Sequence, residues 1–279
     1  MLILIVAKNR HSLAMSLAAT IAQWLDARGV DSRVVEHRPG ATEFTTTEAR
    51  GADLVLVLGG DGTFISVARQ TLGLGLPLLG VNLGQVGFLT STCPARWPAA
   101  LEQIISGGVS REERMVLSFC VEREGDVACR GQVVNDLVVG RGSIARLVRL
   151  RLEYGAERVG TLRCDGMIIA TPTGSTAYSV SAGGPLVHPS LSVYCLTPVA
   201  PFRNDFRPLV LPADRTVALT VEEPHGEINL TEDGQRLFAL KSGDRILVEP
   251  ARQGLSLVRL NGDSYFKTLA DKGFMVERG

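Results

Sequence analysis

The sequence lacks the residue patterns of zinc-bound and disulfide-stabilised proteins. Its five cysteines, at positions 93, 120, 129, 164 and 195, form no CxxC pair, and their number is odd. The four histidines are scattered and make no HExxH motif. Reduced thiols in a cytoplasmic protein fit this usage better than a disulfide framework or a zinc site.

Neither a basic excess nor a candidate membrane span is present. Lys and Arg together number 29, as do Asp and Glu, so the formal net charge is zero. Because proteins that bind duplex nucleic acid through its phosphates normally carry a basic excess, we expect no nucleic-acid partner. The apolar run at the N-terminus is too short for a signal sequence. The uncharged stretch 70–95 is interrupted by glycine and proline, so we expect no membrane insertion.

Glycine is the one residue present in excess. The chain has 279 residues, of which 45% are hydrophobic, 21% are charged and 30 are glycine. The length suits two domains, and the charged and apolar fractions are those of a globular protein. Extra glycine indicates backbone in conformations that a side chain disfavours, or backbone that lies close to a ligand.

Residues 1–111 alternate between strand and helix patterns. Continuous apolar runs are typical of parallel strands covered on both faces, and apolar residues three and four apart predict helices. Ser12 is the expected cap of the first helix. The predicted strands are 2–7, 30–36, 53–58 and 78–82, and the predicted helices are 13–25, 64–72 and one that starts at Pro98. We therefore predict an N-terminal α/β domain with an open parallel sheet.

Residues 112–262 predict a second, mostly β domain. Short β-rich runs broken by glycine replace the helical periodicity, and Leu147–Leu152 alternates strictly between apolar and polar residues. Such alternation predicts a strand with one face in water. The charged run Arg111–Arg114 is interpreted as a solvated segment at the domain junction. The tail, 263–279, is predicted to return to the first domain.

The first chemical motif is Gly59-Gly60-Asp61-Gly62-Thr63, which follows a predicted strand and precedes a helix. Backbone N–H groups and the helix dipole favour a phosphate at such a turn, and glycine lets the phosphate approach. A carboxylate there repels phosphate unless it binds Mg²⁺ or accepts a proton from an attacking hydroxyl. The alternative is a structural turn in which Asp61 caps the helix.

The second motif is a cluster of hydroxyl side chains between Thr171 and Ser181, after the short apolar run Met167–Ala170. Thr173–Ser181 offers donors for phosphate and ribose oxygens, and small residues leave room for a flat ring beside Tyr178. The alternative is a helix start whose hydroxyls bond to nearby backbone. Two shorter motifs are turns by default: Asn135-Asp136 as an Asx turn and Asp233-Gly234-Gln235 as a hairpin turn.

Taken in order, these motifs closely resemble the NAD kinases. The resemblance spans about residues 54 to 270 and is most specific in the segment from Asp165 to Pro185. The glycine loop alone is less specific, because diacylglycerol kinases, sphingosine kinases and phosphofructokinases have similar loops. The resemblance implies a cytoplasmic homodimer or homotetramer. The resemblance further implies that the protein transfers the γ-phosphate of ATP to the 2′-hydroxyl of the adenosine ribose of NAD, with Mg²⁺ or Mn²⁺ as the divalent metal cofactor.

The resemblance also implies roles for individual residues. Asp61 matches the catalytic acid–base, while the glycine loop would hold the ATP phosphates and, at Gly62, contact NAD. Asn135 and Asp136 match the pair that holds the adenosine. The remaining expected nucleotide contacts are Gly60, Thr63, Arg146, Arg163, Asp165, Thr173, Thr176, Ala177, Tyr178, Ser179, Val180, Ser181, Ala200 and Gln235. The protein ligands of the metal stay open.

One residue departs from the family pattern. NAD kinases usually have Asn-Glu where this chain has Asn135-Asp136, so the carboxylate is retained with a reach shorter by about an ångström. A displacement of that size can lower the rate of a positioned reaction about 100-fold. Two other functions remain open: a kinase of a lipid or sugar acceptor that shares the glycine loop, and a non-catalytic NAD-binding sensor.

Overall fold

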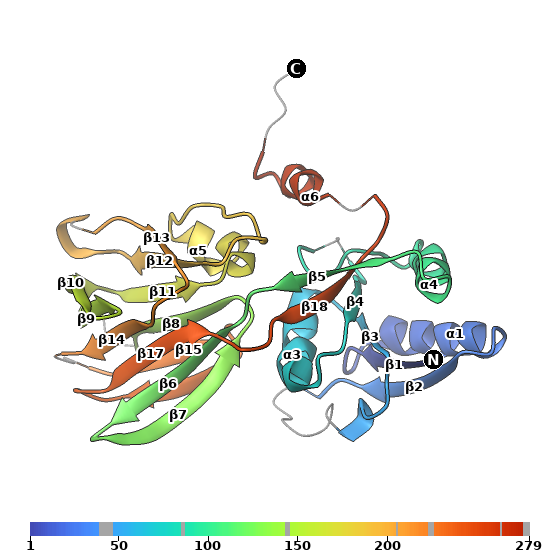
Figure 1. Cartoon of the computed structure of the whole chain (residues 1–279), viewed down its shortest axis with the longest axis horizontal. Helices are drawn as coiled ribbons and strands as arrows, with labels where there is room; N and C mark the ends of the chain where they lie inside the picture. The colour runs from blue at the N-terminus through green and yellow to red at the C-terminus, as the bar shows by residue number, and fades with distance from the viewer. Residues whose placement is uncertain are drawn as a thin grey trace. The chain divides into compact units, whose positions relative to one another are not determined.

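A computed structural model describes residues 1–38, 47–84, 87–142, 146–204, 206–222, 226–262 and 264–275. The chain divides into two compact units (Figure 1). The first unit contains Met1–Glu113 and Leu255–Gly279, and the second contains Arg114–Gly254. The last part of the chain thus belongs with the N-terminal part.

A six-stranded sheet organises the first unit, with the strand order β2-β1-β3-β4-β18-β5. Strand β1 pairs in parallel with β2 and β3, and β4 pairs in parallel with β3 and β18. The strands are β1 (Leu2–Ala7), β2 (Asp31–Glu36), β3 (Leu54–Leu58), β4 (Leu78–Val81), β5 (Ser110–Arg114) and β18 (Leu255–Arg259). The predicted N-terminal α/β fold is therefore confirmed.

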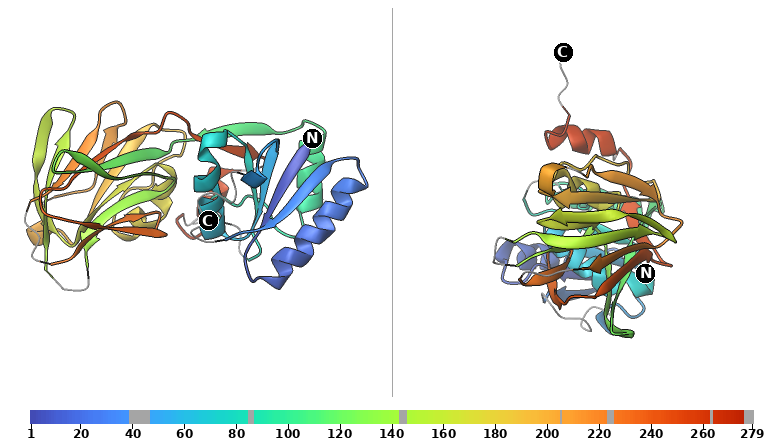
Figure 2. Two further views of the ribbon diagram at one scale, coloured as in Figure 1. Left: turned by 90° about the horizontal axis from the view of Figure 1, so that it is seen from below. Right: turned by 90° about the vertical axis from the view of Figure 1, so that its left-hand side faces the viewer.

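Helices cover both faces of this sheet (Figure 2). Helices α1 (Ser12–Asp26) and α4 (Trp97–Ile105) share a core with β1 and β3, while α3 (Asp61–Thr71) lies on the opposite face. A 3₁₀ turn (Leu72–Leu74) follows α3, and α6 (Tyr265–Asp271) lies in the C-terminal segment. The predicted cap of the first helix is wrong by one residue. His11 is the N-cap, and its Nδ1 accepts a hydrogen bond from the N–H of Ala14 at 3.3 Å.

Two strands of the first sheet differ from the sequence expectation. The charged run 111–114, interpreted above as a solvated segment, forms most of β5 at the edge of the sheet. An ion pair of 2.9 Å joins Glu112 to Arg259 of β18. Strand β18 itself lies in the stretch assigned above to the β-rich domain, yet it pairs with β4. Charged residues are tolerated at a sheet edge because one side of such a strand faces water.

The second unit is a sandwich of two six-stranded antiparallel sheets (Figure 1). The first sheet has the order β10-β9-β14-β17-β6-β7 and the second has the order β13-β12-β11-β8-β15-β16. The strands are β6 (Leu117–Arg123), β7 (Asp126–Val133), β8 (Asp136–Arg141), β9 (Val148–Tyr154), β10 (Glu157–Cys164), β11 (Gly166–Ala170), β12 (Val193–Val199), β13 (Leu209–Pro212), β14 (Val217–Val221), β15 (Ile228–Glu232), β16 (Arg236–Leu240) and β17 (Arg245–Pro250). Short helical turns occupy Thr173–Thr176, Tyr178–Ser181 and Phe202–Asn204.

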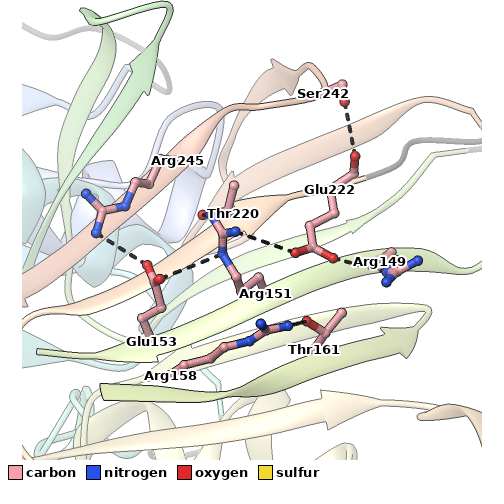
Figure 3. A network of polar contacts seen from close by, with 9 residues as sticks. All are labelled: Arg149, Arg151, Glu153, Arg158, Thr161, Thr220, Glu222, Ser242 and Arg245. Carbon is pink, nitrogen blue, oxygen red and sulfur yellow. Dashed lines mark hydrogen bonds and ion pairs between the residues drawn. The ribbon is translucent and has the colours of Figure 1, made fainter. Parts of the chain in front are cut away.

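Strand β9 shows how the sandwich separates its core from water. Val148, Leu150 and Leu152 are buried in the core between the two sheets. The alternate residues point outward and form an ion-pair network with neighbouring strands, including a 3.0 Å pair between Arg149 and Glu222 (Figure 3). The predicted wet face of this strand is therefore confirmed.

Among the described residues, no helix is both long and apolar enough to cross a membrane.

Candidate active site

The glycine loop joins β3 to α3 at the carboxyl end of a central parallel strand. Gly60 is the N-cap of α3, and its carbonyl accepts a hydrogen bond from the Phe64 N–H at 3.0 Å. Side chains added at Gly60 and Gly62 would meet no atom within 4 Å, so the backbone there faces open space. A Cβ at Gly59 would lie 2.8 Å from the Cβ of Thr63. The close approach of Thr63 explains the glycine at position 59, and none of the three glycines has a positive φ.

The Asp61 side chain is held by the loop that follows β4. Its Oδ2 accepts a hydrogen bond from the N–H of Phe88 at 2.9 Å. Its Oδ1 accepts from the N–H groups of Leu89 and Thr90, each at 3.3 Å, and from the Thr90 hydroxyl at 2.9 Å. The capping alternative for Asp61 is wrong, since the cap residue is Gly60 and the carboxylate is bonded to residues 88–90.

Three residues of this arrangement were absent from the sequence prediction. Asn82 donates its side-chain amide to the Thr90 hydroxyl at 2.8 Å, and the N–H of Gly87 donates to the same oxygen at 3.1 Å. A Cβ at Gly87 would lie 2.0 Å from Oδ1 of Asp61, so only glycine fits there. The one available signal was the glycine content of the uncharged stretch 70–95, which indicates a loop without indicating what the loop contacts.

In the second unit, a single carboxylate holds the backbone of the Asn135-Asp136 segment. Asp233 accepts hydrogen bonds from the N–H groups of Val134 at 3.0 Å, Asn135 at 2.7 Å and Asp136 at 3.1 Å. Asp233 lies in the turn between β15 and β16, where it and Gly234 both have positive φ. The predicted hairpin turn is confirmed, and its aspartate also positions the segment predicted to hold adenosine.

Asp136 is a buried carboxyl beside a second carboxyl. Its side chain is 5% exposed. Burial, reinforced by the nearby charge of Asp233, raises the pKa of Asp136 to about 7, although the backbone N–H of Tyr178 donates to the carboxylate and opposes the rise. The carboxyl of Asp136 therefore changes its protonation state near neutral pH.

The raised pKa of Asp136 predicts how stability depends on pH. In the unfolded chain the carboxyl ionises near its ordinary value, so the folded state binds more protons between about pH 4 and pH 7. Stability from this residue is therefore fully present below pH 4 and falls as the pH rises to 7, by at most about 1.4 kcal/mol per pH unit. Urea unfolding of the wild type and of Asp136→Asn at several pH values gives the difference between their free energies of unfolding, which should change with pH. A difference that stays constant from pH 4 to 7 contradicts the prediction.

Most of the clustered hydroxyls build the loop that carries them. The Thr171 hydroxyl donates to the Val134 carbonyl at 2.7 Å, and that of Thr176 donates to the Thr173 carbonyl at 3.1 Å. The buried hydroxyl of Ser179 is paired with Thr197 at 2.9 Å. These three hydroxyls have hydrogen-bond partners within the protein and so support the loop, while their contact with a ligand stays a prediction. Val180 and Ser181 continue the short helix from Tyr178.

Gly174 brings this loop against the Asn135-Asp136 segment. A Cβ at Gly174 would lie 2.0 Å from the carbonyl oxygen of Asn135. That carbonyl accepts a hydrogen bond from the Thr171 N–H at 2.8 Å. Thr173 is buried, and Arg114 donates to its hydroxyl at 3.5 Å. The second unit thus brings together Asn135, Asp136, Thr173 and the backbone of Tyr178, and their contact with a nucleotide stays a prediction.

A pocket of about 410 Å³ lies on the outer side of the second sheet. Asp165 and Tyr178 of the predicted residues line it, and an ion pair of 2.8 Å joins Asp165 to Arg141. The other lining residues are Val138, Gly140, Gly142, Gly166, Val199, Asn229, Thr231 and Leu237. This volume is within the range of about 300–1,000 Å³ usual for small-molecule sites.

Five further predicted residues lie outside this pocket lining. Arg163 stacks on Phe202, with its guanidinium 5.2 Å from the ring centroid. Ala200, with φ at +45°, follows β12, and Arg146 is exposed before β9. Gln235 lies in the β15–β16 turn, with its N–H bonded to the Glu232 carbonyl at 2.8 Å. Ala177, between the two short helical turns, is half-buried.

Two family models together match 234 of the 279 residues. The ATP-NAD kinase N-terminal domain matches residues 3–109, and the ATP-NAD kinase C-terminal domain matches residues 134–260. The chain belongs to the NAD kinase family. A protein named NAD kinase from Nitratidesulfovibrio vulgaris strain Miyazaki F is 48% identical over 276 residues, covering 99% of this chain and 97% of that protein. The NAD kinase of Oleidesulfovibrio alaskensis is 44% identical over 273 residues, covering 98% and 93% of the two chains.

Solved NAD kinase structures share the fold. An NAD kinase from Archaeoglobus fulgidus in complex with ATP superposes with a TM-score of 0.78 at 25% identity, covering 98% of each chain. Yeast NADH kinase complexed with NADH gives a TM-score of 0.87 at 21% identity, covering 100% of this chain and 89% of the yeast chain. The yeast comparison supports the fold alone. The predicted family membership and fold class are confirmed.

Proposed function

We propose that this protein uses ATP to phosphorylate NAD at the 2′-hydroxyl of the adenosine ribose, and so makes NADP. The match of the chain to both NAD kinase domains carries the proposal. The 48% identity to a protein named NAD kinase, over almost the full length, supports the same activity. Phosphoryl transfer requires from a protein mainly positioning and charge stabilisation, and the two groups of residues described above are suited to those tasks.

The glycine loop is proposed to hold the phosphates of ATP. The backbone at Gly60 and Gly62 borders open space at the N-terminus of α3, where the helix dipole favours anions. Helix α3 is 11 residues long, enough for aligned peptide dipoles to add. The loop follows β3 at the carboxyl end of the sheet, the edge where open α/β sheets bind ligands.

Asp61 is proposed to accept the proton of the reacting hydroxyl through Oδ2. A carboxylate oxygen has two acceptor positions. Oδ1 receives three hydrogen bonds, whereas Oδ2 receives one, from Phe88, among the described residues. Oδ2 thus retains an acceptor position for the hydroxyl proton.

The second unit is proposed to bind NAD. The Asn135-Asp136 segment and the Tyr178 backbone form one fixed group at one end of β11, where Ala170 pairs with Asp136. At the other end of β11, Gly166 is adjacent to Asp165 and the pocket. Four residue steps along a strand span about 13 Å, so the two ends of β11 suit an elongated ligand. We propose that Arg146, Arg163, Thr173, Ala200 and Gln235 add further contacts to the dinucleotide.

A divalent metal is proposed to arrive with ATP. The described residues contain no group of three or more His, Cys, Asp or Glu side chains able to hold a metal ion. Mg²⁺ is commonly bound through one or two carboxylates together with substrate phosphates, and Asp61 supplies one carboxylate at the glycine loop. When bound, Mg²⁺ or Mn²⁺ would offset the charge of the transferred phosphoryl group.

We also propose a homodimer or homotetramer in the cytoplasm. Apolar side chains on the edge strands of the second sheet support self-association, since Leu237 is 67% exposed and Val210 is 45% exposed. The five cysteines without a CxxC pair suit a reducing compartment. Analytical ultracentrifugation tests the oligomeric state, and a monomer at micromolar concentration rejects it.

The activity is tested with the purified full-length chain. ATP, NAD and MgCl₂ are supplied, and NADP is measured with an NADP-specific dehydrogenase. NADP is expected only when all three are present, and excess EDTA should abolish its formation. A parallel screen offers lipid and sugar acceptors with labelled ATP. Labelling of those acceptors without NADP formation, or NAD binding without turnover under Mg²⁺ and Mn²⁺, rejects the proposal.

A further inference from the structure

The hydrogen bonds that the Thr90 hydroxyl accepts leave only one direction for its proton. Its oxygen accepts hydrogen bonds from the Asn82 amide at 2.8 Å and from the Gly87 N–H at 3.1 Å. A hydroxyl has two acceptor positions and one proton, so both acceptor positions are occupied. The proton is therefore directed to the remaining partner, Oδ1 of Asp61, at 2.9 Å.

The packing of the Thr90 methyl group favours the same side-chain orientation as the hydrogen bonds of its hydroxyl. A Cβ built on Gly80 of β4 would lie 2.6 Å from Cγ2 of Thr90. The methyl thus fills the space above Gly80 that a larger residue would occupy. Because the methyl and the hydroxyl share one χ1 angle, packing on Gly80 and the hydrogen bonds favour a single rotamer.

We propose that Thr90 is a positioning residue for phosphoryl transfer: it fixes Oδ1 of Asp61 and leaves Oδ2 as the oxygen that meets the reacting hydroxyl. This inference rests on the proposed function and on the proposed role of Asp61. Without the Thr90 hydroxyl, Oδ1 keeps only two longer contacts of 3.3 Å, and the carboxylate gains rotational freedom about its Cβ–Cγ bond. Loss of orientation at a reacting atom lowers kcat more than it lowers substrate binding.

Two substitutions separate the hydroxyl from the methyl group. Thr90→Val keeps the shape and the contact with Gly80 but removes the hydroxyl, whereas Thr90→Ser keeps the hydroxyl and removes the methyl. We expect Thr90→Val to lower kcat about 10- to 100-fold, with KM for NAD and ATP changed less than about threefold. Thr90→Ser should keep kcat within about threefold of the wild type.

A double-mutant cycle tests whether Thr90 acts through Asp61. In an Asp61→Asn background, Thr90→Val should lower the residual kcat by less than about twofold, because the group it orients is already gone. A structural role independent of Asp61 would instead lower kcat by the same factor in both backgrounds. Should Thr90→Val fail to fold, Thr90→Ala removes the hydroxyl with less bulk and enters the same cycle.

The outcomes for Thr90 and for the proposed function are distinguishable. Absence of NADP formation by the wild type rejects the function before any variant is compared. With an active wild type, equal kcat values for Thr90→Val and Thr90→Ser, or equal effects of Thr90→Val with and without Asp61, overturn the positioning role alone. Serine rescue together with a non-additive cycle supports it.

Discussion

Asp61→Asn should lower kcat for NADP formation by about 100- to 10,000-fold, the usual effect of removing a general base. Asparagine has nearly the shape of aspartate, and its amide oxygen can accept hydrogen bonds from the loop at 88–90. The amide cannot take up the proton of the ribose hydroxyl at neutral pH. If the NH₂ group replaces Oδ2, it also faces the Phe88 N–H, which is a donor. We therefore expect a loss in kcat while NAD binding persists.

Asp53→Asn is the matched control for this variant. Asp53 lies immediately before β3, in the same unit, and its exposed carboxylate accepts a hydrogen bond from the Leu2 N–H at 2.8 Å. Asp53 belongs to neither group of proposed active-site residues, so its variant should turn over at the wild-type rate. Initial-rate kinetics give kcat, and calorimetric titration with NAD gives binding separately. A loss below about threefold for Asp61→Asn would remove Asp61 from the proton-accepting role.

Local patterns were sufficient to predict much of the first sheet. Strands β1 and β3 are continuous apolar runs, because helices cover them on both faces. Strand β5 was missed because its sequence, Ser-Arg-Glu-Glu-Arg, has the composition of a solvated loop. Only its pairing at the sheet edge makes it a strand. Strand β18 was misplaced because its partner β4 is far away in sequence, and no local pattern encodes that pairing.

In the site, too, local sequence patterns identified some residues, while residues that matter through contacts distant in sequence were missed. Asp61 follows a strand signal directly, so the local pattern made it a candidate. The Asn135-Asp136 pair is a turn by its local pattern and became a candidate only through the resemblance to the NAD kinases. Thr90 was missed because a threonine in an uncharged loop has no distinguishing pattern, and its importance arises from a contact across 29 positions with Asp61. The internal partners of the Thr171 and Ser179 hydroxyls could not be predicted either, because Val134 and Thr197 are distant from them in sequence.

Asp233→Gly should lower the free energy of unfolding by about 3 kcal/mol, because three N–H groups at 134–136 lose their shared acceptor. Glycine tolerates the positive φ of 48°, so backbone strain adds nothing to the loss. Asp233→Asn should fall between Asp233→Gly and the wild type. Its amide oxygen can still accept from Asn135 and Asp136, while its NH₂ group faces the Val134 N–H. Urea unfolding measures the stabilities.

The β6–β7 turn provides the matched control. Glu124 has a φ of +54° and precedes Gly125 with a φ of +92°, the same backbone pattern as Asp233-Gly234. Because the Glu124 side chain is exposed, Glu124→Gly changes the turn without removing a buried acceptor. It should alter the free energy of unfolding by less than about 1 kcal/mol. If both glycine variants lose equal stability, the turn conformation and not the Asp233 carboxylate supports the segment. A larger loss at Asp233, together with weaker NAD binding by the folded variant, would show that this turn holds the Asn135-Asp136 backbone in its binding geometry.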